Sequence, residues 1–238
     1  MFKMLKPSRP TASHGPAFRL GWFLGRLIVW FLALSVGLVL IYRFVPPPVT
    51  VTMLADPSGF SKDWTSLGEI DRNMVDAAIA GEDAKFCLHN GFDPVAIEKA
   101  FVRNRQGGRI RGGSTISQQT AKNVFLWQGG GYLRKGLEAW FTLLIETLWG
   151  KRRIMEVYLN VAETGIGTYG VEAGAQRYYN KPALHLSPVE AARIAAAFPQ
   201  PKVRAVNGAT GFTRRHGNAI AARIGTVRGA ALDGCVYR

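Results

Sequence analysis

One uncharged apolar run near the amino terminus constrains this chain more than any other feature. Nearly every residue of Trp22–Phe44 is apolar, and the stretch 27–42 carries no charge. At about 1.5 Å per residue, this stretch would span roughly 24 Å as a helix, and Arg26 and Arg43 could extend to the two bilayer interfaces. A soluble core helix rarely runs this long without a polar face. We therefore expect residues 22–44 to form one membrane-spanning helix.

The charges around this run predict its orientation. The basic residues that precede it are Lys3, Lys6, Arg9 and Arg19. No acidic residue occurs before Asp56, so the positive-inside rule places the tail 1–21 in the cytoplasm and the rest of the chain outside. A cleaved signal peptide has a similar start, but prolines 46–48 follow the run where a small-x-small cleavage pattern would be needed. We expect an uncleaved anchor, a linker with a short extended segment over 45–66, and one domain over 67–238.

The remainder of the chain is basic and has few cysteines. The formal net charge is +14, and +8 of it remains beyond residue 45. Such a surface favours polyanions, namely nucleic acid, anionic lipid headgroups or a lipid pyrophosphate, and the predicted topology argues against nucleic acid. Cys87 and Cys235 are the only cysteines; an oxidising compartment would permit a disulfide without requiring one, and the sequence favours leaving them unpaired.

The apolar periodicity beyond the prolines is mostly helical. Apolar residues recur at helical spacing near 70–78, 133–148 and 154–161. Further helices are predicted over 94–104, 115–126, 168–179, 188–197 and 212–228, and Ser187 and Glu190 give the helix at 188 a capping box. Only 49–54 is predicted to be a strand. The segment 165–170 matches Gly-x-Gly-x-x-Gly, but a helical pattern precedes it instead of a strand, so we interpret it as a loop between helices.

The first polar block suggests an acid–base residue. Residues 82–91 read Glu-Asp-Ala-Lys-Phe-Cys-Leu-His-Asn-Gly. Val75, Ala78 and Ile79 form an apolar helical stripe that Glu82 continues, and a carboxylate half withdrawn from water keeps a raised pKa, which suits a proton acceptor near neutral pH. The alternative is an ordinary glutamate at a helix end, paired with Lys85.

The second block suggests an anion site. Residues 112–119 read Gly-Gly-Ser-Thr-Ile-Ser-Gln-Gln. On a helix from Thr115 with Ser114 as its N-cap, Gln118 and Lys122 lie one turn apart, with Gln119 and Asn123 beside them. Free N–H groups and the helix dipole attract anions there, so the block outlines a pyrophosphate cradle. The alternative is a capped helix with a polar outer face.

A third block, Arg134-Lys135-Gly-Leu-Glu138, places Arg134 and Glu138 four residues apart. The two side chains would pair on one helix face. An isolated surface ion pair is the alternative.

Together these blocks resemble the peptidoglycan glycosyltransferases of family 51. The first motif, Glu-Asp-x-x-Phe-x-x-His-x-Gly, is filled at every fixed position; Gly112–Gln119 and Arg134–Glu138 resemble the second and third. Lys151–Asn160 resembles the fourth, with Met155 where leucine is usual, and Gly170, Ala173 and Tyr178 match the fifth. The resemblance covers about 74–200 and implies a mostly α, lysozyme-like two-lobed domain behind the anchor.

The resemblance implies a function and a set of site residues. Glu82 would deprotonate the acceptor 4-hydroxyl of lipid II, which attacks the lipid-linked donor strand with inversion to a β-1,4 bond and loss of undecaprenyl pyrophosphate. Glu138 would be the second catalytic carboxylate. The implied substrate-binding residues are Asp83, Phe86, His89, Ser114, Thr115, Gln118, Gln119, Lys122, Asn123, Arg134, Lys135 and Glu156, the last bracing the fold or site from behind.

The resemblance also implies surroundings and leaves alternatives. The catalytic domain would face the periplasm from the bacterial inner membrane, beside possible cell-wall synthesis proteins. No cofactor and no metal site are implied, and assistance by a divalent cation stays open.

Departures from the family pattern are Gly129–Gly131 in place of a basic loop, Lys99 and Gly174. Without a Ser-x-x-Lys, no transpeptidase is expected. A muramidase or lytic transglycosylase, or a non-catalytic cell-wall scaffold, are the alternatives.

Overall fold

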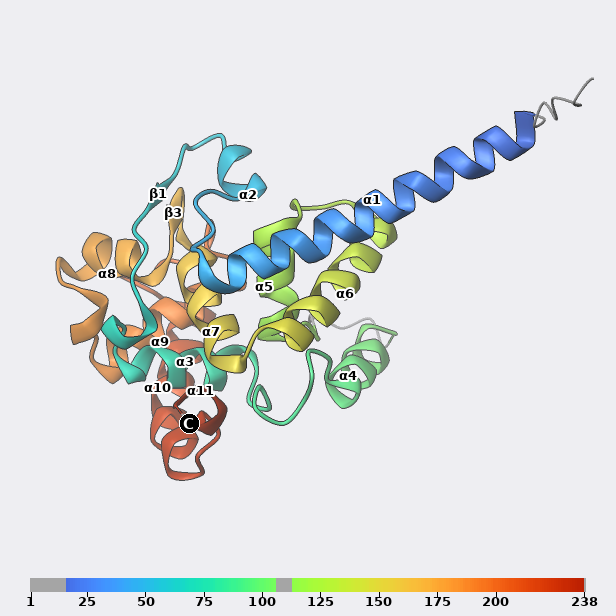
Figure 1. Cartoon of the computed structure of the whole chain (residues 1–238). Coiled ribbons are helices and arrows are strands. Elements are labelled where there is room, and N and C mark those ends of the chain that lie inside the picture. The colour runs from blue at the N-terminus through green and yellow to red at the C-terminus, as the bar shows by residue number, and fades with distance from the viewer. Residues whose placement is uncertain (1–15, 106–112, 238) are drawn as a thin grey trace, which may run out of the picture. The chain divides into compact units, whose positions relative to one another are not determined.

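The computed structural model describes residues 16–105 and 113–237 (Figure 1). Predictions that involve Lys3, Lys6, Arg9 and Gly112 lie outside these residues. The chain divides into two units, residues 1–38 and 39–238, which are described separately.

Helix α1 (Pro16–Phe44) accounts for the described part of the first unit and continues into the second. Within the described ranges it is the one helix long and apolar enough to cross a membrane, over Arg19–Phe44. Its large apolar side chains, such as Val29 and Leu34, are exposed. This fits the single membrane anchor predicted from the sequence.

The second unit is mostly helical, as predicted. After α2 (Val51–Leu54) and the 3₁₀ turn η1 (Leu67–Glu69), its longer helices follow in the order α3 (Arg72–Glu82), α4 (Pro94–Arg105), α5 (Ile116–Phe125), α6 (Gly131–Leu148), α7 (Lys151–Val161), α8 (Val171–Tyr179), α9 (Pro188–Ala197) and α10 (Gly211–Gly229). Between α8 and α9 lies the 3₁₀ turn η2 (Ala183–His185), and the short helix α11 (Gly234–Tyr237) follows α10. The capping box predicted for α9 is present, because Ser187 Oγ accepts from the Glu190 N–H and the Glu190 carboxylate accepts from the Ser187 N–H.

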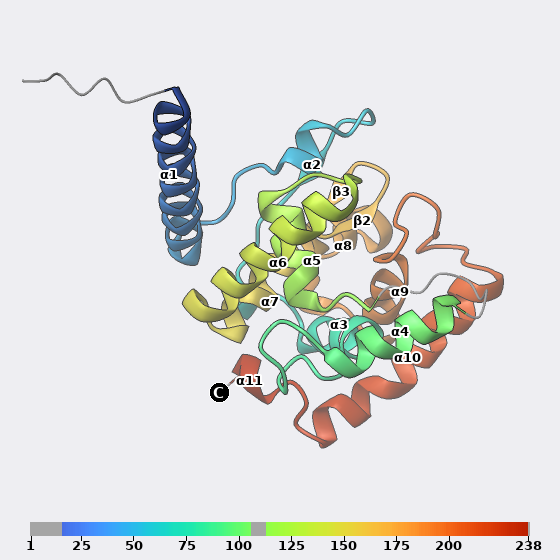
Figure 2. The same cartoon turned by 90° about the vertical axis from the view of Figure 1, so that its right-hand side faces the viewer.

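Two groups of helices form the core of this unit (Figure 2). Helix α3 packs on α9 and α10, through the small buried residues Ala77 and Ala78 on α3 and the alanines 191–197 on α9. Helix α5 packs on α6 and α7. Small side chains let helix axes approach closely. The carboxyl end of α3 meets the start of α5, where the Ile116 N–H donates to Asp83 and Gln119 donates to Glu82. This arrangement positions the candidate site.

The predicted strand over 49–54 is wrong. Its β-branched residues form helix α2, because the Thr50 side chain caps the turn by accepting from the Met53 N–H at 3.3 Å, and the turn buries Met53. A capped turn that buries one large side chain satisfies the backbone without a partner strand.

The loop predicted over 165–170 is also wrong. It is a hairpin of β2 (Glu163–Gly165) and β3 (Thr168–Tyr169), whose turn contains Gly167 at a φ of +62°. Strand β1 (Ser61–Lys62) pairs in parallel with β3, giving the order β1-β3-β2. Helix α8 consequently starts at Val171 and not at 168.

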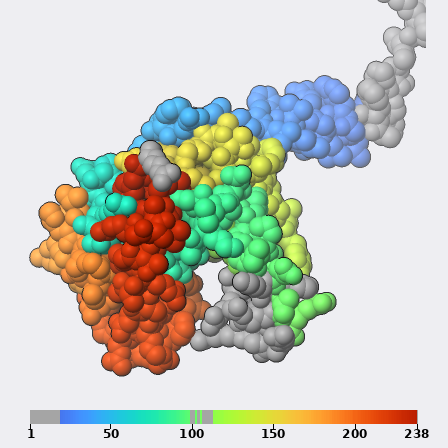
Figure 3. Space-filling model, turned by 90° about the horizontal axis from the view of Figure 1, so that it is seen from below, coloured from blue at the N-terminus to red at the C-terminus, as the bar shows by residue number. Residues whose placement is uncertain are grey.

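The two cysteines are joined, contrary to the sequence-based expectation. Cys87, in the loop after α3, forms a disulfide with Cys235 of α11, with a Cα–Cα distance of 5.4 Å. A separation of 148 residues leaves no local pattern from which to predict the pair. Figure 3 shows the red C-terminal segment lying against the green segment that follows α3.

Candidate functional site

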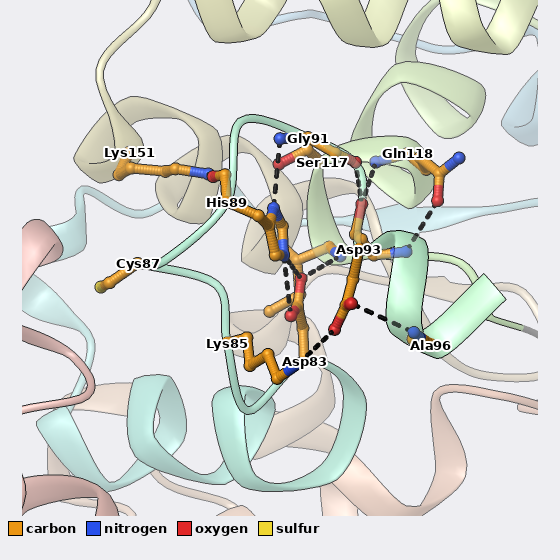
Figure 4. A network of polar contacts seen from close by, with 12 residues as sticks. Asp83, Lys85, Cys87, His89, Gly91, Asp93, Ala96, Ser117, Gln118 and Lys151 are labelled. Carbon is orange, nitrogen blue, oxygen red and sulfur yellow. Dashed lines mark hydrogen bonds and ion pairs between the residues drawn. The ribbon is translucent and has the colours of Figure 1, made fainter. Parts of the chain in front are cut away.

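The loop that follows α3 is fixed by a buried carboxylate (Figure 4). Asp83 accepts from His89 Nε2 at 3.0 Å and from the Ile116 N–H, at the first residue of α5, at 3.1 Å. The Asp83 side chain is 4% exposed and that of His89 is 8% exposed. A carboxylate at a helix N-terminus also interacts favourably with the helix dipole. Asp83 therefore joins the end of α3 to the start of α5.

The hydrogen bonds of His89 define its tautomer. Its Nδ1 accepts from the Gly91 N–H at 3.1 Å, so the proton of the neutral ring lies on Nε2 and points at Asp83. The Thr115 hydroxyl donates to the Gly91 carbonyl at 2.6 Å. We call Asp83, His89, Gly91, Thr115 and the Ile116 N–H the Asp83 network; all these groups have hydrogen-bond partners.

The N-cap of α5 differs from the predicted one. Thr115, not Ser114, caps the helix: its hydroxyl accepts from the Gln118 N–H at 3.2 Å, and Gln118 Oε1 accepts from the Thr115 N–H at 3.0 Å. Thr115 is preferred because its side chain also reaches Gly91. The capping box uses the Gln118 side-chain carbonyl, while Ser114 Oγ lies 3.3 Å from Lys135 Nζ, which donates to it.

Glu82 has a different environment from its neighbour Asp83. Gln119 Nε2 donates to Glu82 Oε2 at 2.8 Å, whereas the buried Oε1 makes no hydrogen bond within the part of the chain that the structure describes. Burial raises the pKa of Glu82, although the Gln119 hydrogen bond lowers it in part. The alternative pairing with Lys85 is wrong, because Lys85 lies 3.4 Å from Asp93. Glu82 is thus a buried carboxyl group with one oxygen unused.

A buried ion cluster lies next to Lys122. Arg134 Nη1 donates to Glu138 Oε2 at 2.6 Å, as the i,i+4 spacing predicts, and Lys135 pairs with Glu138 Oε1. The Glu138 side chain is only 3% exposed, so the alternative of a surface ion pair is wrong. Burial lowers the pKa of Lys122, and Arg134 and Lys135 lower it further while Glu138 opposes them. Glu138 thus pairs with two cationic side chains, and Lys122 is near enough to interact electrostatically with all three residues.

A cavity of about 140 Å³ lies beside Gln119. Of the predicted site residues, Gln119, Lys122 and Asn123 line it. Its other walls come from α2, α7, the β2–β3 hairpin and the chain after α9; its lining includes Thr52, Tyr158, Glu163, Tyr169, Phe198 and Pro201. Lys122 both lines this cavity and interacts electrostatically with the Glu138 cluster, so it links the two. We call this cavity the polar cavity.

Phe86 and Glu156 are among the predicted site residues that do not line the polar cavity, as are Glu82 and Glu138. Phe86 is fully buried, with Lys151 Nζ 4.5 Å from its ring centroid. Glu156 accepts from the Leu67 N–H at 3.0 Å and from Arg153 Nη1 at 2.5 Å. Glu156 therefore connects η1 to α7.

Sequence reasoning missed Thr52, Tyr158 and Glu163, all of which line the cavity. Tyr158 has helical apolar spacing and reads as a core residue. Glu163 lies in the segment interpreted as bordering a loop, and Thr52 in the segment predicted to be a strand. In each case the sequence held one signal of a site residue, namely a polar side chain within an otherwise apolar or glycine-rich segment.

Comparisons with known proteins identify the family of this chain. The family model described as "Transglycosylase" matches residues 50–224. A relative from Caulobacter vibrioides named "Biosynthetic peptidoglycan transglycosylase" is 49% identical over 216 residues, covering 88% of this chain and 94% of the relative. Relatives with the same name from Pseudomonas aeruginosa and Bdellovibrio bacteriovorus are 49% and 46% identical, covering 74% and 89% of this chain and 80% and 89% of their own lengths.

Proposed function

Because this chain belongs to the transglycosylase family, we propose that it polymerises lipid II into β-1,4-linked glycan strands of peptidoglycan. The observation that carries the proposal is Glu82, a buried carboxyl group with a raised pKa and one unused oxygen, which accepts a hydrogen bond from Gln119, a residue that lines the polar cavity. A proton acceptor for a sugar hydroxyl needs these properties.

Glu82 acts as the general base. Its ionised form accepts the proton of the acceptor 4-hydroxyl, and the resulting oxygen attacks the anomeric carbon of the lipid-linked donor. The C–O bond to the pyrophosphate breaks as the new bond forms, with inversion, and undecaprenyl pyrophosphate leaves. The leaving group supplies the driving force, so the acceptor needs only deprotonation and alignment.

The Glu138 cluster binds the leaving pyrophosphate. Lys122, Arg134 and Lys135 converge there, and Glu138 holds Arg134 and Lys135 in place. Cationic groups fixed in advance stabilise charge as it develops without having to reorganise. Ser114, next to Lys135, contributes a hydroxyl to the same side. We propose Glu138 as the second carboxylate of the reaction in this supporting sense.

The membrane helix supports a location for the reaction. We propose that α1 spans the inner membrane once, with the basic tail in the cytoplasm and residues 67–238 in the periplasm, where lipid II and the growing strand are reached. The Cys87–Cys235 disulfide fits an oxidising compartment. Cell-wall synthesis proteins are the partners proposed there.

The test is polymerisation of labelled lipid II by the detergent-solubilised full-length chain. The native protein should form polymer, and Glu82→Gln should lower the rate by about 10²–10⁴-fold, the usual contribution of a general base. Glu98→Gln, the same change on the exposed surface of α4, is the matched control and should remain active. Absence of polymer from the native protein, with release of fragments from purified sacculi, would instead assign the site to wall cleavage.

A further inference from the structure

We propose that Glu163, with Thr52 and Tyr158, forms a wall of the polar cavity that binds a neutral N-acetylated sugar unit and excludes phosphate. This inference rests on the proposed function and gives these residues a role that the sequence analysis did not assign to them. It gives the site two chemically different sides, which would fix the direction in which the substrates lie.

Unused hydrogen-bonding atoms gather at this wall. Across residues 16–105 and 113–237, three of the buried side-chain atoms without a hydrogen bond are Thr52 Oγ1, Tyr158 OH and Glu163 Oε1, and all three residues line the polar cavity. Tyr158 is fully buried. A buried polar atom without a partner costs about 1–3 kcal/mol, so three of them around one cavity indicate a ligand that offers hydroxyl and amide groups.

The wall is built and held in place. Asp56 accepts from Tyr169 OH and from Lys202 Nζ, each at 2.8 Å, and from the Ser58 N–H at 3.0 Å. Helix α2 carries Thr52, and Asp56 follows shortly after its end. The bonds of Asp56 therefore connect the end of α2 to the hairpin that carries Glu163. Lys202 Nζ lies 3.7 Å from Glu163 Oε1, close enough to compensate part of its charge but too far for a hydrogen bond.

The cavity is lined by residues of both charges. Lys122, from α5, interacts with Arg134 and Lys135, where a pyrophosphate is favoured. Glu163, from β2, interacts with the negative charge of Asp56, so its carboxylate repels phosphate but accepts hydrogen bonds from sugar hydroxyls and from an acetamido N–H. A substrate with a sugar at one end and a pyrophosphate at the other would therefore bind in one orientation.

Two soluble probes test the two sides separately during lipid II polymerisation by the full chain. N,N′-diacetylchitobiose represents the neutral sugar, and inorganic pyrophosphate represents the leaving group. We expect both to inhibit the native enzyme. In Glu163→Ala, the inhibition constant of the disaccharide and the KM for lipid II should each rise about tenfold or more, as for loss of a hydrogen bond to a charged group. The inhibition constant of pyrophosphate should stay within about twofold.

A conservative variant and a surface variant complete the design. Glu163→Gln keeps an accepting oxygen and should lose less disaccharide inhibition than Glu163→Ala, which separates binding from a folding defect. Glu98→Gln should match the native enzyme with both probes. Disaccharide inhibition that is absent from the native enzyme, or equal in native and Glu163→Ala protein, overturns the inference while leaving the proposed function intact. A native protein that makes no polymer refutes the proposed function first.

Discussion

Glu82 and Asp83 are neighbours in the sequence but belong to regions with opposite properties. In the Asp83 network each polar group has a partner, and the carboxylate joins α3 to α5 through His89 and the Ile116 N–H. Among the described residues, an oxygen without a hydrogen bond is found on the cavity residues Tyr158, Thr52 and Glu163, and on Glu82, which is bonded to the cavity residue Gln119. The comparison teaches that a network whose hydrogen-bonding groups are all paired fixes the positions of α3 and α5. The cavity wall, whose hydrogen-bonding groups are partly unpaired, can still bind substrate.

The two regions depend on one another physically. Unsatisfied buried groups destabilise the fold, so a cavity wall that contains several of them needs rigid support nearby. The Asp83 network fixes the carboxyl end of α3 to α5, the helix that carries Gln119 and Lys122 to the cavity, and the Cys87–Cys235 disulfide connects the loop after α3 to α11. Changes in the Asp83 network should therefore alter mainly stability, and changes at the cavity mainly activity.

The largest effect on stability is expected for Asp83→Ala. This change leaves the His89 ring and the Ile116 N–H without their acceptor in a buried site. We expect the free energy of unfolding to fall by about 3 kcal/mol, or roughly 6–12 °C in Tm for a domain of this size. Thermal unfolding in detergent measures it. Asp63→Ala, on the exposed linker, is the control and should leave Tm unchanged. An equally stable Asp83→Ala protein would show that the network is not the support.

The disulfide is the second fastening of this region. Replacing both Cys87 and Cys235 by alanine removes a crosslink between positions 148 residues apart, which should cost about 2–4 kcal/mol. The native protein in reductant should unfold like the double variant, and the double variant should not respond to reductant. If reductant destabilises both proteins equally, the effect does not come from this crosslink. The KM for lipid II should change little, because neither cysteine lines the polar cavity.

Much of this comparison could be predicted from the sequence, but only where the signal is local. The apolar run, the capping box at Ser187 and the i,i+4 pair of Arg134 and Glu138 depend on residues close in the chain, and all are present. The disulfide and the polar cavity depend on distant segments. Tyr158 reads as core because its spacing is helical, and only the tertiary arrangement shows that its hydroxyl has no partner. Thr115 caps α5 because Gly91, far along the chain, accepts from it.

Tyr158→Phe removes a single hydroxyl group and tests the cavity wall whose hydrogen-bonding atoms are unpaired. Removing a hydroxyl that has no partner in the described chain also removes its desolvation cost, so stability should be unchanged or rise by up to about 1 kcal/mol. If the hydroxyl binds substrate, the KM for lipid II should rise severalfold. Steady-state kinetics and thermal unfolding of the same preparation check both. A loss of stability without a change in KM would place Tyr158 in the core alone.

The smallest expected effect is a shift in the pH dependence of activity on removal of the hydrogen bond between Gln119, which lines the cavity, and Glu82. Gln119 donates to Glu82 and so lowers its pKa, against the larger raising effect of burial. The base must be ionised, so activity falls as the pH drops through this pKa. Gln119→Met removes the donor and keeps the volume, which raises the pKa further and moves the acidic limb of kcat/KM to higher pH.

Gln128→Met is the matched control for this shift. Gln128 lines the same cavity but bonds to Asn123 and not to Glu82, so its replacement should leave the acidic limb in place. The alkaline limb should be the same in both variants, because within the described residues the Gln119 side chain donates to Glu82 and not to Lys122, Arg134 or Lys135. An acidic limb that does not move in Gln119→Met, or that moves equally in Gln128→Met, would mean that a group other than Glu82 sets it. The acidic limb of kcat/KM reports the ionisation of the general base itself. The measurement therefore distinguishes Glu82 from Asp83, because only Glu82, the carboxylate with an unused oxygen, should set the pH at which activity is lost.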